Sequence, residues 1–241
     1  MAAGETGLIN AAKEPEVVDL AMFLNAMGAR IEGAGSDTLK IVGVEKLHGV
    51  TYRPIPDRIE AGTFMYAAAI VRGNVVLRGV VPHHLRPVIA KLRESGADVW
   101  EGNDWLQVMA QSRLQAVDIK TMPWPGYPTD LQAQAMALST LAHGVSVISE
   151  NVFENRFMHV SELERMGAQI RIKDHNAIVD GMPSLSGARV KVPDLRAGAA
   201  LVLAALAAEG ESVVEDTGHI DRGYDRLVEK LASLGARIAR G

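Results

Sequence analysis

Three stretches of the chain place an aspartate at the start of an alanine-rich, apolar helix pattern. The aspartates are Asp57, Asp130 and Asp194, and Arg58 and Arg196 follow within the first turn of two of these helices. Aspartate is a preferred N-cap, so capping is the simplest role for each carboxylate taken singly. An arginine in the first turn opposes the helix dipole, whereas a guanidinium can bind phosphate or carboxylate through two parallel hydrogen bonds. The pattern therefore favours an anion-binding pocket if the three helix starts converge.

Two loops add further polar side chains at the ends of expected elements. The stretch "SENVFENRFMH" follows a strand pattern, and "GHIDRGYDR" precedes the last helix pattern. Surface ion pairs, which contribute little to stability, are the simplest role for each arginine of these loops taken alone. Together with Arg58 and Arg196, however, four arginines lie at element ends, which favours a shared anion site. The polar residues of the two loops are Glu154, Asn155, Arg156, His219, Asp221 and Arg222.

A recurring signature indicates which elements position these residues. A helix pattern ends in Gly-Ala or Gly-Ala-like sequence and runs directly into a β-rich stretch at Gly28, Gly96, Gly167 and Gly235. Glycine supplies the left-handed conformation that ends a helix, and β-branched residues suit the strand that follows. Copies spaced by roughly 70 residues indicate one supersecondary unit repeated along the chain.

Each repeat also contains one helix of a second type. The aspartate-led helices are rich in Ala and apolar residues on all sides, so we expect them to be buried. The helices that precede the glycine signature, such as "LRPVIAKLRESG", are amphipathic, and we expect them to face solvent. The repeat reads strand, buried helix, strand, amphipathic helix and two further strands. We therefore predict an α/β fold of repeated βαβαββ units packed around buried helices.

Composition excludes several classes of protein. The 241 residues are 48% hydrophobic and carry a net charge of −4, which argues for a globular core and against nucleic-acid binding. Because there is no cysteine, this chain holds no disulfide, thiolate metal ligand or cysteine nucleophile. The histidines lack HxxxH spacing, so we expect no zinc site. The longest apolar run, residues 197–208, is too short to span a bilayer, and the first residues do not resemble a signal peptide. We expect a cytoplasmic protein that does not bind membranes.

Five long motifs resemble one family of enzymes. "PDRIEAGTF", "YPTDLQAQ", "ENVFENRFMHVSELERMGA", "DLRAGAALVLAALAAEG" and "HIDRGYDRL" are similar to the UDP-N-acetylglucosamine 1-carboxyvinyltransferases, which are enolpyruvyl transferases. The resemblance implies the enolpyruvyl transferase and RNA 3′-terminal phosphate cyclase-like fold, with two lobes of three βαβαββ units each. It also implies transfer of the enolpyruvyl group from phosphoenolpyruvate to the 3-hydroxyl of UDP-N-acetylglucosamine, with release of phosphate. This reaction is the first committed step of peptidoglycan synthesis, and it uses no cofactor and no metal.

The resemblance also implies roles for individual residues. Asp130 matches the residue that interacts with the 3-hydroxyl as general base or proton relay. The loop "PWPGYPTD", with three prolines and a glycine, would hold this carboxylate at a helix start, as preorganised acid–base catalysis requires. Asp194 matches a carboxylate near the reacting centre, and Val152 matches a backbone contact to the sugar nucleotide. Arginines of the same motifs hold the phosphate and carboxylate of phosphoenolpyruvate or lock the closed state. The candidate catalytic residues are therefore Asp130, Asp194 and Arg196, and the candidate substrate-binding residues are Asp130, Val152, Arg156, Arg222 and Arg58.

The chain departs from this family in length. It has no match to the family's Lys-Asn pair, uridine-binding segment or mobile loop that carries a cysteine or an aspartate. The family's interlobe linker falls near residues 52–57. We therefore predict that residues 1–54 are a remnant of the catalytic-loop lobe and that residues 55–241 are the second lobe, without one N-terminal segment. Such a chain is expected to be inactive alone, and to self-associate or pair with a missing N-terminal half.

Three interpretations of the function remain open from the sequence. The chain is part of the enzyme described above, or a non-catalytic module that binds an anion or a partner, or a related enzyme such as a 3-phosphoshikimate carboxyvinyltransferase or an RNA 3′-phosphate cyclase. The strings PTD, ENRF and HIDRGY favour the first interpretation over the third. A companion polypeptide that supplies the missing half would distinguish the first from the second.

Overall fold

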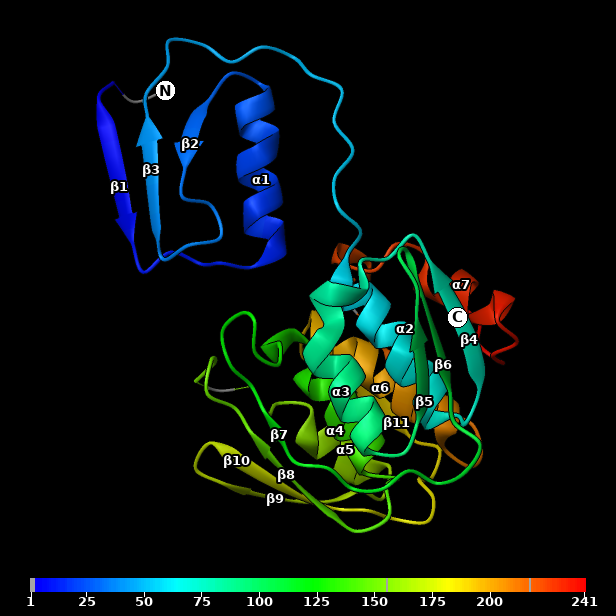
Figure 1. The fold of residues 1–241 in the computed structure, drawn as a ribbon. Coiled ribbons are helices and arrows are strands. Elements are labelled where there is room, and N and C mark those ends of the chain that lie inside the picture. The colour runs from blue at the N-terminus through cyan, green and yellow to red at the C-terminus, as the bar shows by residue number, and fades with distance from the viewer. Residues whose placement is uncertain (1–2, 155, 217) are drawn as a thin grey trace. The chain divides into compact units, whose positions relative to one another are not determined.

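The computed structural model describes residues 3–154, 156–216 and 218–241. The chain divides into two units, which Figure 1 shows as ribbons. The first unit comprises residues 1–56 and 123–126, and the second comprises residues 57–122 and 127–241.

The first unit is built on one helix and a three-stranded sheet. Its strands are antiparallel in the order β1-β3-β2, with Glu5 and Arg30 both opposite Val42. The helix begins at a proline, which fits the first helical position, and it ends before Gly28, whose φ of 99° is left-handed. The elements are β1 (Glu5–Ile9), α1 (Pro15–Ala26), β2 (Arg30–Glu32) and β3 (Thr38–Val42).

The second unit contains three copies of a related succession of elements. The first copy is α2 (Arg58–Ile70), β4 (Asn74–Arg78), η1 (Pro82–Leu85), α3 (Arg86–Glu94), β5 (Asp98–Glu101) and β6 (Trp105–Met109). The second copy is β7 (Ile119–Lys120), η2 (Thr129–Leu131), α4 (Gln132–Ser139), β8 (Val145–Ser149), α5 (Val160–Arg165), β9 (Gln169–Lys173) and β10 (Asn176–Asp180). The third copy is β11 (Arg189–Lys191), α6 (Leu195–Ala207), β12 (Val213–Glu215), η3 (Ile220–Arg222) and α7 (Leu227–Ser233).

The sheets of the three copies differ in how complete they are. The second copy has four strands in the order β7-β8-β10-β9, in which β7 is parallel to β8 and the other pairs are antiparallel. The first copy has the three antiparallel strands β4-β6-β5. The third copy has only the parallel pair β11-β12 among the described residues. The second copy therefore shows the full βαβαββ repeat.

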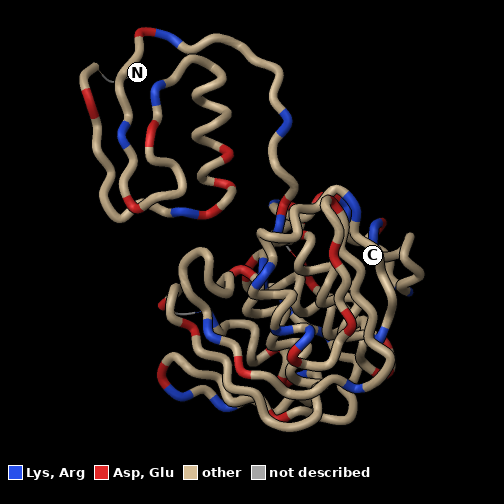
Figure 2. The backbone as a smooth tube through the Cα atoms, viewed as in Figure 1, with Lys and Arg blue, Asp and Glu red and all other residues tan. Residues whose placement is uncertain are grey.

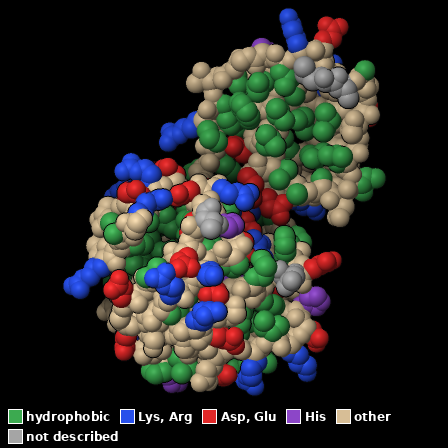
Figure 3. Space-filling view, turned by 180° about the vertical axis from the view of Figure 1, so that it is seen from behind, with side chains coloured by type: hydrophobic (Ala, Val, Ile, Leu, Met, Phe, Trp, Pro, Cys, Tyr) green, Lys and Arg blue, Asp and Glu red, His purple; other side chains and the backbone are tan. Residues whose placement is uncertain are grey.

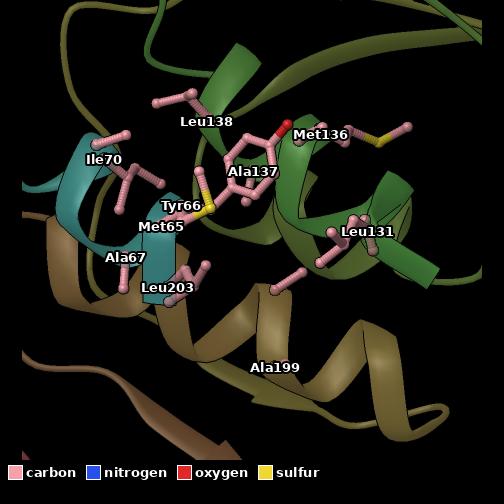
Figure 4. Packing of buried hydrophobic residues seen from close by; sticks show 14 of the residues in the cluster. Met65, Tyr66, Ala67, Ile70, Leu131, Met136, Ala137, Leu138, Ala199 and Leu203 are labelled. Atoms are coloured by element: carbon pink, nitrogen blue, oxygen red, sulfur yellow. The ribbon is translucent and has the colours of Figure 1, made fainter. Parts of the chain in front are cut away.

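The core of the second unit lies where α2, α4 and α6 pack against one another (Figure 4). Met65, Met136 and Leu201, one from each helix, are completely buried. Helices that are apolar on all sides gain most from such a central position, and the sheets and amphipathic helices lie outside them in Figure 1. The helix α3, for example, buries only Val88, Ile89 and Leu92.

The predicted α/β repeat architecture is confirmed, with one exception at its last copy. Gly28, Gly96, Gly167 and Gly235 all have positive φ, and β2, β5 and β9 follow the first three. The prediction of a strand after Gly235 is wrong, because residues 236–241 form no strand. In the other copies this strand pairs with the next strand of the chain, which supplies its hydrogen bonds.

Charged residues of both signs are distributed along the backbone of each unit (Figure 2). No long run carries one sign, in agreement with the small net charge. Among the described residues, no helix combines the length and the apolar character needed to cross a bilayer.

Candidate active site

Asp130 lies at the centre of a cluster of partly buried charges at the start of α4. Its Oδ1 accepts a hydrogen bond from Arg156 Nη2 at 2.7 Å. Its Oδ2 accepts from Arg196 Nε at 3.2 Å and from Arg196 Nη2 at 3.0 Å. Both arginine side chains are only 16% exposed. One carboxylate thus joins two guanidinium groups from different repeats.

The three aspartates at helix starts do not share one role. Asp57 caps α2 by accepting from Ile59 N and Glu60 N, at 2.7 and 3.2 Å. Asp194 caps α6 in the same way, accepting from the backbone N–H groups of Arg196 and Ala197 at 2.7 and 2.9 Å. Capping, the simplest role, is wrong for Asp130, which lies within the 3₁₀ turn η2 and makes no cap hydrogen bond. Its carboxylate instead pairs with Arg156 and Arg196.

Arg156 is held in place by a buried carboxylate that the sequence did not reveal. Its Nη1 donates to Thr129 Oγ1 at 2.8 Å, and that hydroxyl donates to Glu150 Oε2 at 2.9 Å. Glu150 is 2% exposed, and its Oε1 accepts from Thr121 Oγ1 at 2.7 Å. The same oxygen accepts from Val152 N and Phe153 N. These four donors compensate the buried charge and fix the loop after β8 against the turn that carries Asp130.

Arg196 also contacts an aromatic ring. Its Cζ lies 5.6 Å from the ring centroid of Tyr224, which is completely buried. Burial would lower the pKa of Arg196, but Tyr224 and Asp130 outweigh it and raise the pKa. The third guanidinium nitrogen, Nη1, is buried and has no hydrogen-bond partner among the described residues.

The charges of the cluster control its protonation. Burial would raise the pKa of Asp130, but Arg196 and Arg156 outweigh it and hold the pKa below its usual value. Burial lowers the pKa of His159 to about 4, against the opposing effect of Asp194 and with a further contribution from Arg156. At neutral pH, Asp130 is a carboxylate and His159 is an uncharged imidazole.

The predicted convergence of the helix starts is present. The contact between Asp130 and Arg196 joins the leading turn of α4 to the start of α6. Asp57, at the start of α2, is close enough to Arg196 to help raise its pKa. The ends of three helices from three repeats thus lie near one another, as the anion-pocket interpretation requires.

The other predicted residues lie around this cluster or away from it. Arg58 is buried at the first position of α2. The backbone N–H of Val152 is already used by Glu150, and the Val152 side chain is exposed. Arg222 is exposed at the end of η3. Glu154 is exposed, His219 contacts Asp216, Asp221 pairs with Arg240 on the surface, and Asn155 lies outside the described residues.

Sequence reasoning missed Thr129, Glu150 and Tyr224. The strings "PTD" and "ISEN" contained a signal for the first two, since a threonine and a glutamate at a strand end are suited to buried hydrogen bonding. Their connection to Arg156 depends on a contact between segments 21 residues or more apart, which no local pattern reveals.

The fold and the site define an α/β protein of repeated units whose buried helices converge on a carboxylate–arginine cluster. A family profile described as EPSP synthase (3-phosphoshikimate 1-carboxyvinyltransferase) matches residues 1–231. The chain therefore belongs to this family of enolpyruvyl transferases.

Curated relatives indicate which kind of enolpyruvyl transferase this chain most resembles in sequence. The chain is 58% identical over 237 residues to UDP-N-acetylglucosamine 1-carboxyvinyltransferase 1 of Caldanaerobacter subterraneus subsp. tengcongensis, covering 98% of this chain and 57% of the relative. It is 57% identical over 242 residues to UDP-N-acetylglucosamine 1-carboxyvinyltransferase 2 of Carboxydothermus hydrogenoformans, covering 100% of this chain and 58% of the relative. The resemblance inferred from the motifs is confirmed. The chain spans less than two thirds of the length of these relatives.

Solved structures agree on the fold. The enolpyruvyl transferase NikO from Streptomyces tendae matches with a TM-score of 0.86 and 34% identity, over 99% of this chain and 57% of that one. EPSP synthase from Acinetobacter baumannii matches with a TM-score of 0.69 and 20% identity, over 96% of this chain and 57% of that one. The predicted enolpyruvyl transferase fold is confirmed.

Proposed function

We propose that this chain supplies part of the active site of an enzyme that transfers the enolpyruvyl group of phosphoenolpyruvate to the 3-hydroxyl of UDP-N-acetylglucosamine. The observation that carries the proposal is the single carboxylate of Asp130 held between Arg156 and Arg196. The similarity to two curated carboxyvinyltransferases supports this choice of substrates. The product would enter peptidoglycan synthesis, in the cytoplasm, where it would support cell shape and division.

The ion pairs suggest how substrate binding would make Asp130 a stronger base. While both arginines hold Asp130, its pKa is low and it is a weak base. Phosphoenolpyruvate carries a phosphate and a carboxylate, and a guanidinium binds either group through two hydrogen bonds. When Arg156 or Arg196 turns to the ligand, Asp130 loses an opposing charge and its basicity rises. It could then accept the proton of the sugar 3-hydroxyl as that oxygen bonds to the enolpyruvyl carbon and phosphate leaves.

The remaining candidates fit supporting roles. Asp194 holds the start of α6 and thereby Arg196. Glu150 orders the backbone at Val152, which would meet the sugar nucleotide. Arg58 and Arg222 would add positive charge for the anionic substrates. Within the longer protein, residues 1–54 would belong to the lobe with the mobile loop, and residues 55–241 to the other lobe.

Complementation would test the proposal directly. The 241-residue chain would be mixed with the portion of the Caldanaerobacter relative that this chain does not cover. We expect phosphate release from phosphoenolpyruvate that depends on UDP-N-acetylglucosamine in the mixture, and none from either part alone, because catalysis needs both sets of groups together. The proposed reaction would be ruled out if this mixture released no phosphate while a mixture of the relative's own two portions did.

A non-catalytic module is the second candidate, supported by the two arginines that meet at Asp130. Such a module would keep the arginine cluster and bind phosphoenolpyruvate without turnover. This alternative would be supported if calorimetry detected binding of phosphoenolpyruvate to the chain while the complementation mixture released no phosphate.

A further inference from the structure

A buried hydrogen-bond network joins all three repeats behind the candidate site. Thr63 Oγ1 of α2 lies 3.0 Å from Tyr224 Oη, which follows η3. Gln134 Nε2 of α4 lies 3.1 Å from Thr63 Oγ1 and 3.2 Å from Tyr224 Oη. None of the three residues is more than 1% exposed. Three polar side chains thus meet at the centre of an otherwise apolar core.

The network fixes the direction of the tyrosine hydroxyl. Thr63 Oγ1 donates its single hydrogen to the carbonyl oxygen of Ile59 at 2.9 Å. The hydroxyl hydrogen of Tyr224 must therefore be donated to Thr63, since a hydroxyl has one donor and two acceptor lone pairs. Gln134 Nε2 donates to the Tyr224 oxygen. The phenol is consequently held in one orientation, with an electron-rich oxygen and ring.

The face of this fixed ring is in contact with the cation of the site. The guanidinium carbon of Arg196 lies 5.6 Å from the ring centroid, within the range of a cation–π interaction. The same guanidinium uses Nε and Nη2 to hold Asp130 Oδ2. Its Nη1 is the buried donor that has no partner among the described residues. Arg196 thus contacts both the ring of Tyr224 and the carboxylate of Asp130.

We propose that Tyr224 is a positioning residue that acts through Arg196, an inference that rests on the function proposed above. Anchored by Thr63 and Gln134, its ring would hold the guanidinium plane so that Nε and Nη2 both meet Asp130. Interaction with a ring face is directional, whereas a tyrosine that only filled the core would leave the order of Arg196 unchanged.

The order of the Arg196 side chain can be measured directly. In the 241-residue chain labelled with ¹⁵N-arginine, Arg196→Lys assigns the Arg196 Nε–H resonance by its disappearance. We expect that resonance to be sharp and slow to exchange in the natural chain. Tyr224→Phe keeps the ring but frees it from Thr63 and Gln134, so hydrogen exchange at Arg196 Nε should accelerate by about threefold, the scale of a cation–π contact that is weakened but not lost.

Two further variants separate positioning from simple loss of stability. Thr140→Val removes another completely buried hydroxyl, which donates to Ala137 O at 2.7 Å, so it should lower the melting temperature and leave Arg196 unchanged. Thr63→Val removes the acceptor of the Tyr224 hydroxyl and should accelerate exchange even if Tyr224→Phe does not fold. Unchanged Arg196 exchange in Thr63→Val, or in a folded Tyr224→Phe chain, would overturn the inference.

A titration with phosphoenolpyruvate distinguishes this inference from the proposed function. If phosphoenolpyruvate shifts the Arg196 resonance of the natural chain, its affinity should be lower in Tyr224→Phe than in Thr140→Val. If it shifts no resonance of the natural chain, the proposed ligand is wrong. The accelerated exchange in the variants would still support positioning of Arg196 by Tyr224.

Discussion

At the scale of single residues, the site depends on Asp130 balancing two cations. A role limited to helix capping would let Asn replace Asp130 without loss of stability. Asp130 makes no cap hydrogen bond, however, and its charge lies between the two arginines. Removing its charge would leave Arg156 and Arg196 facing one another without a counter-charge.

Asp130→Asn should therefore affect both stability and turnover. We expect a lower melting temperature than the natural chain has, and turnover in the complementation mixture reduced by about 10²- to 10⁴-fold, since an amide accepts no proton at neutral pH. Asp57→Asn is the matched control for melting, because Asp57 is a true cap and Asn caps a helix equally well. Near-normal turnover of Asp130→Asn would contradict its role, and equal melting of the two variants would contradict the charge balance.

His159 should make stability depend on pH in a defined window. Its pKa is about 4 in the folded chain and about 6.5 when exposed, so the unfolded chain binds the extra proton first as pH falls. The stabilisation is complete above pH 6.5 and is lost between pH 6.5 and 4, by an amount on the order of 3 kcal/mol. Asp130 has a lowered pKa, so its contribution persists through this window and is lost only below about pH 4.

Urea denaturation at several pH values would check this expectation. The natural chain should become less stable between pH 6.5 and 4, and His159→Gln should lose most of that dependence because glutamine does not titrate. The same slope in both chains would show that other groups cause it.

The sequence predicted Asp130, Arg156 and Arg196 as candidates because their residue types and positions at element ends are visible locally. It could not predict that Glu150 orients Arg156 through Thr129, or that Tyr224 lies against Arg196, since both depend on how separate repeats pack. The clearest sequence signals were therefore the charged groups themselves, and the groups that orient them were hidden.

At the scale of elements, close approach between α6 and its neighbours holds the start of that helix in place. A Cβ added at Gly198 would lie 2.7 Å from Cγ1 of Ile220 and 2.7 Å from Cγ1 of Val192. Both neighbours are β-branched and buried, so neither can move aside easily. Glycine inside a helix normally costs stability, and here it permits the packing that positions Arg196 two residues earlier.

Gly198→Ala should accordingly destabilise the chain, by about 1–3 kcal/mol of overpacking, although alanine is the better helix former. Gly49→Ala is the control, because nothing lies within 4 Å of its added Cβ and its φ is not positive. Chemical denaturation of the two variants would compare them. A Gly198→Ala chain as stable as the natural one would show that α6 is free to shift.

The long helices were predictable because their apolar character persists over many residues. The short parallel strands β7, β11 and β12 were harder, since two or three residues carry little pattern and depend on a neighbouring strand. The missing strand after Gly235 has the same explanation: its residues have strand character, and a strand also needs a partner.

At the scale of the whole molecule, comparison of the repeats shows where the second unit is incomplete. The strand β7 lies beside β8 in the second copy, but no described strand lies at that position beside β4 in the first copy. In the third copy, no described strand lies beside β12 as β10 lies antiparallel beside β8. A groove of about 1030 Å³ lies between α2, β4, α6, β12 and α7, lined by apolar residues that include Phe64, Val75, Val202, Leu206 and Leu231.

Open strand edges and exposed apolar surface favour association with other chains. Val76, on the edge strand β4, is 45% exposed. Figure 3 also shows apolar side chains gathered on one face of the first unit. Exposed apolar residues of this unit include Leu8, Ile9, Leu20 and Met22. The net charge of −4 gives little repulsion to oppose contact between copies.

We therefore expect the 241-residue chain to self-associate as its concentration rises, with a second copy covering the open edge of β4. Light scattering across a concentration series would measure this.

Val76→Lys places a charge on the free edge and should shift the chain toward the monomer without lowering its melting temperature. Val145→Lys is the matched control: Val145 is 54% exposed, but it lies on β8, which is paired on both sides, so association should persist. A monodisperse monomer with one sharp thermal transition would contradict the expectation. Association that responds equally to both lysines would place the contact elsewhere on the molecule.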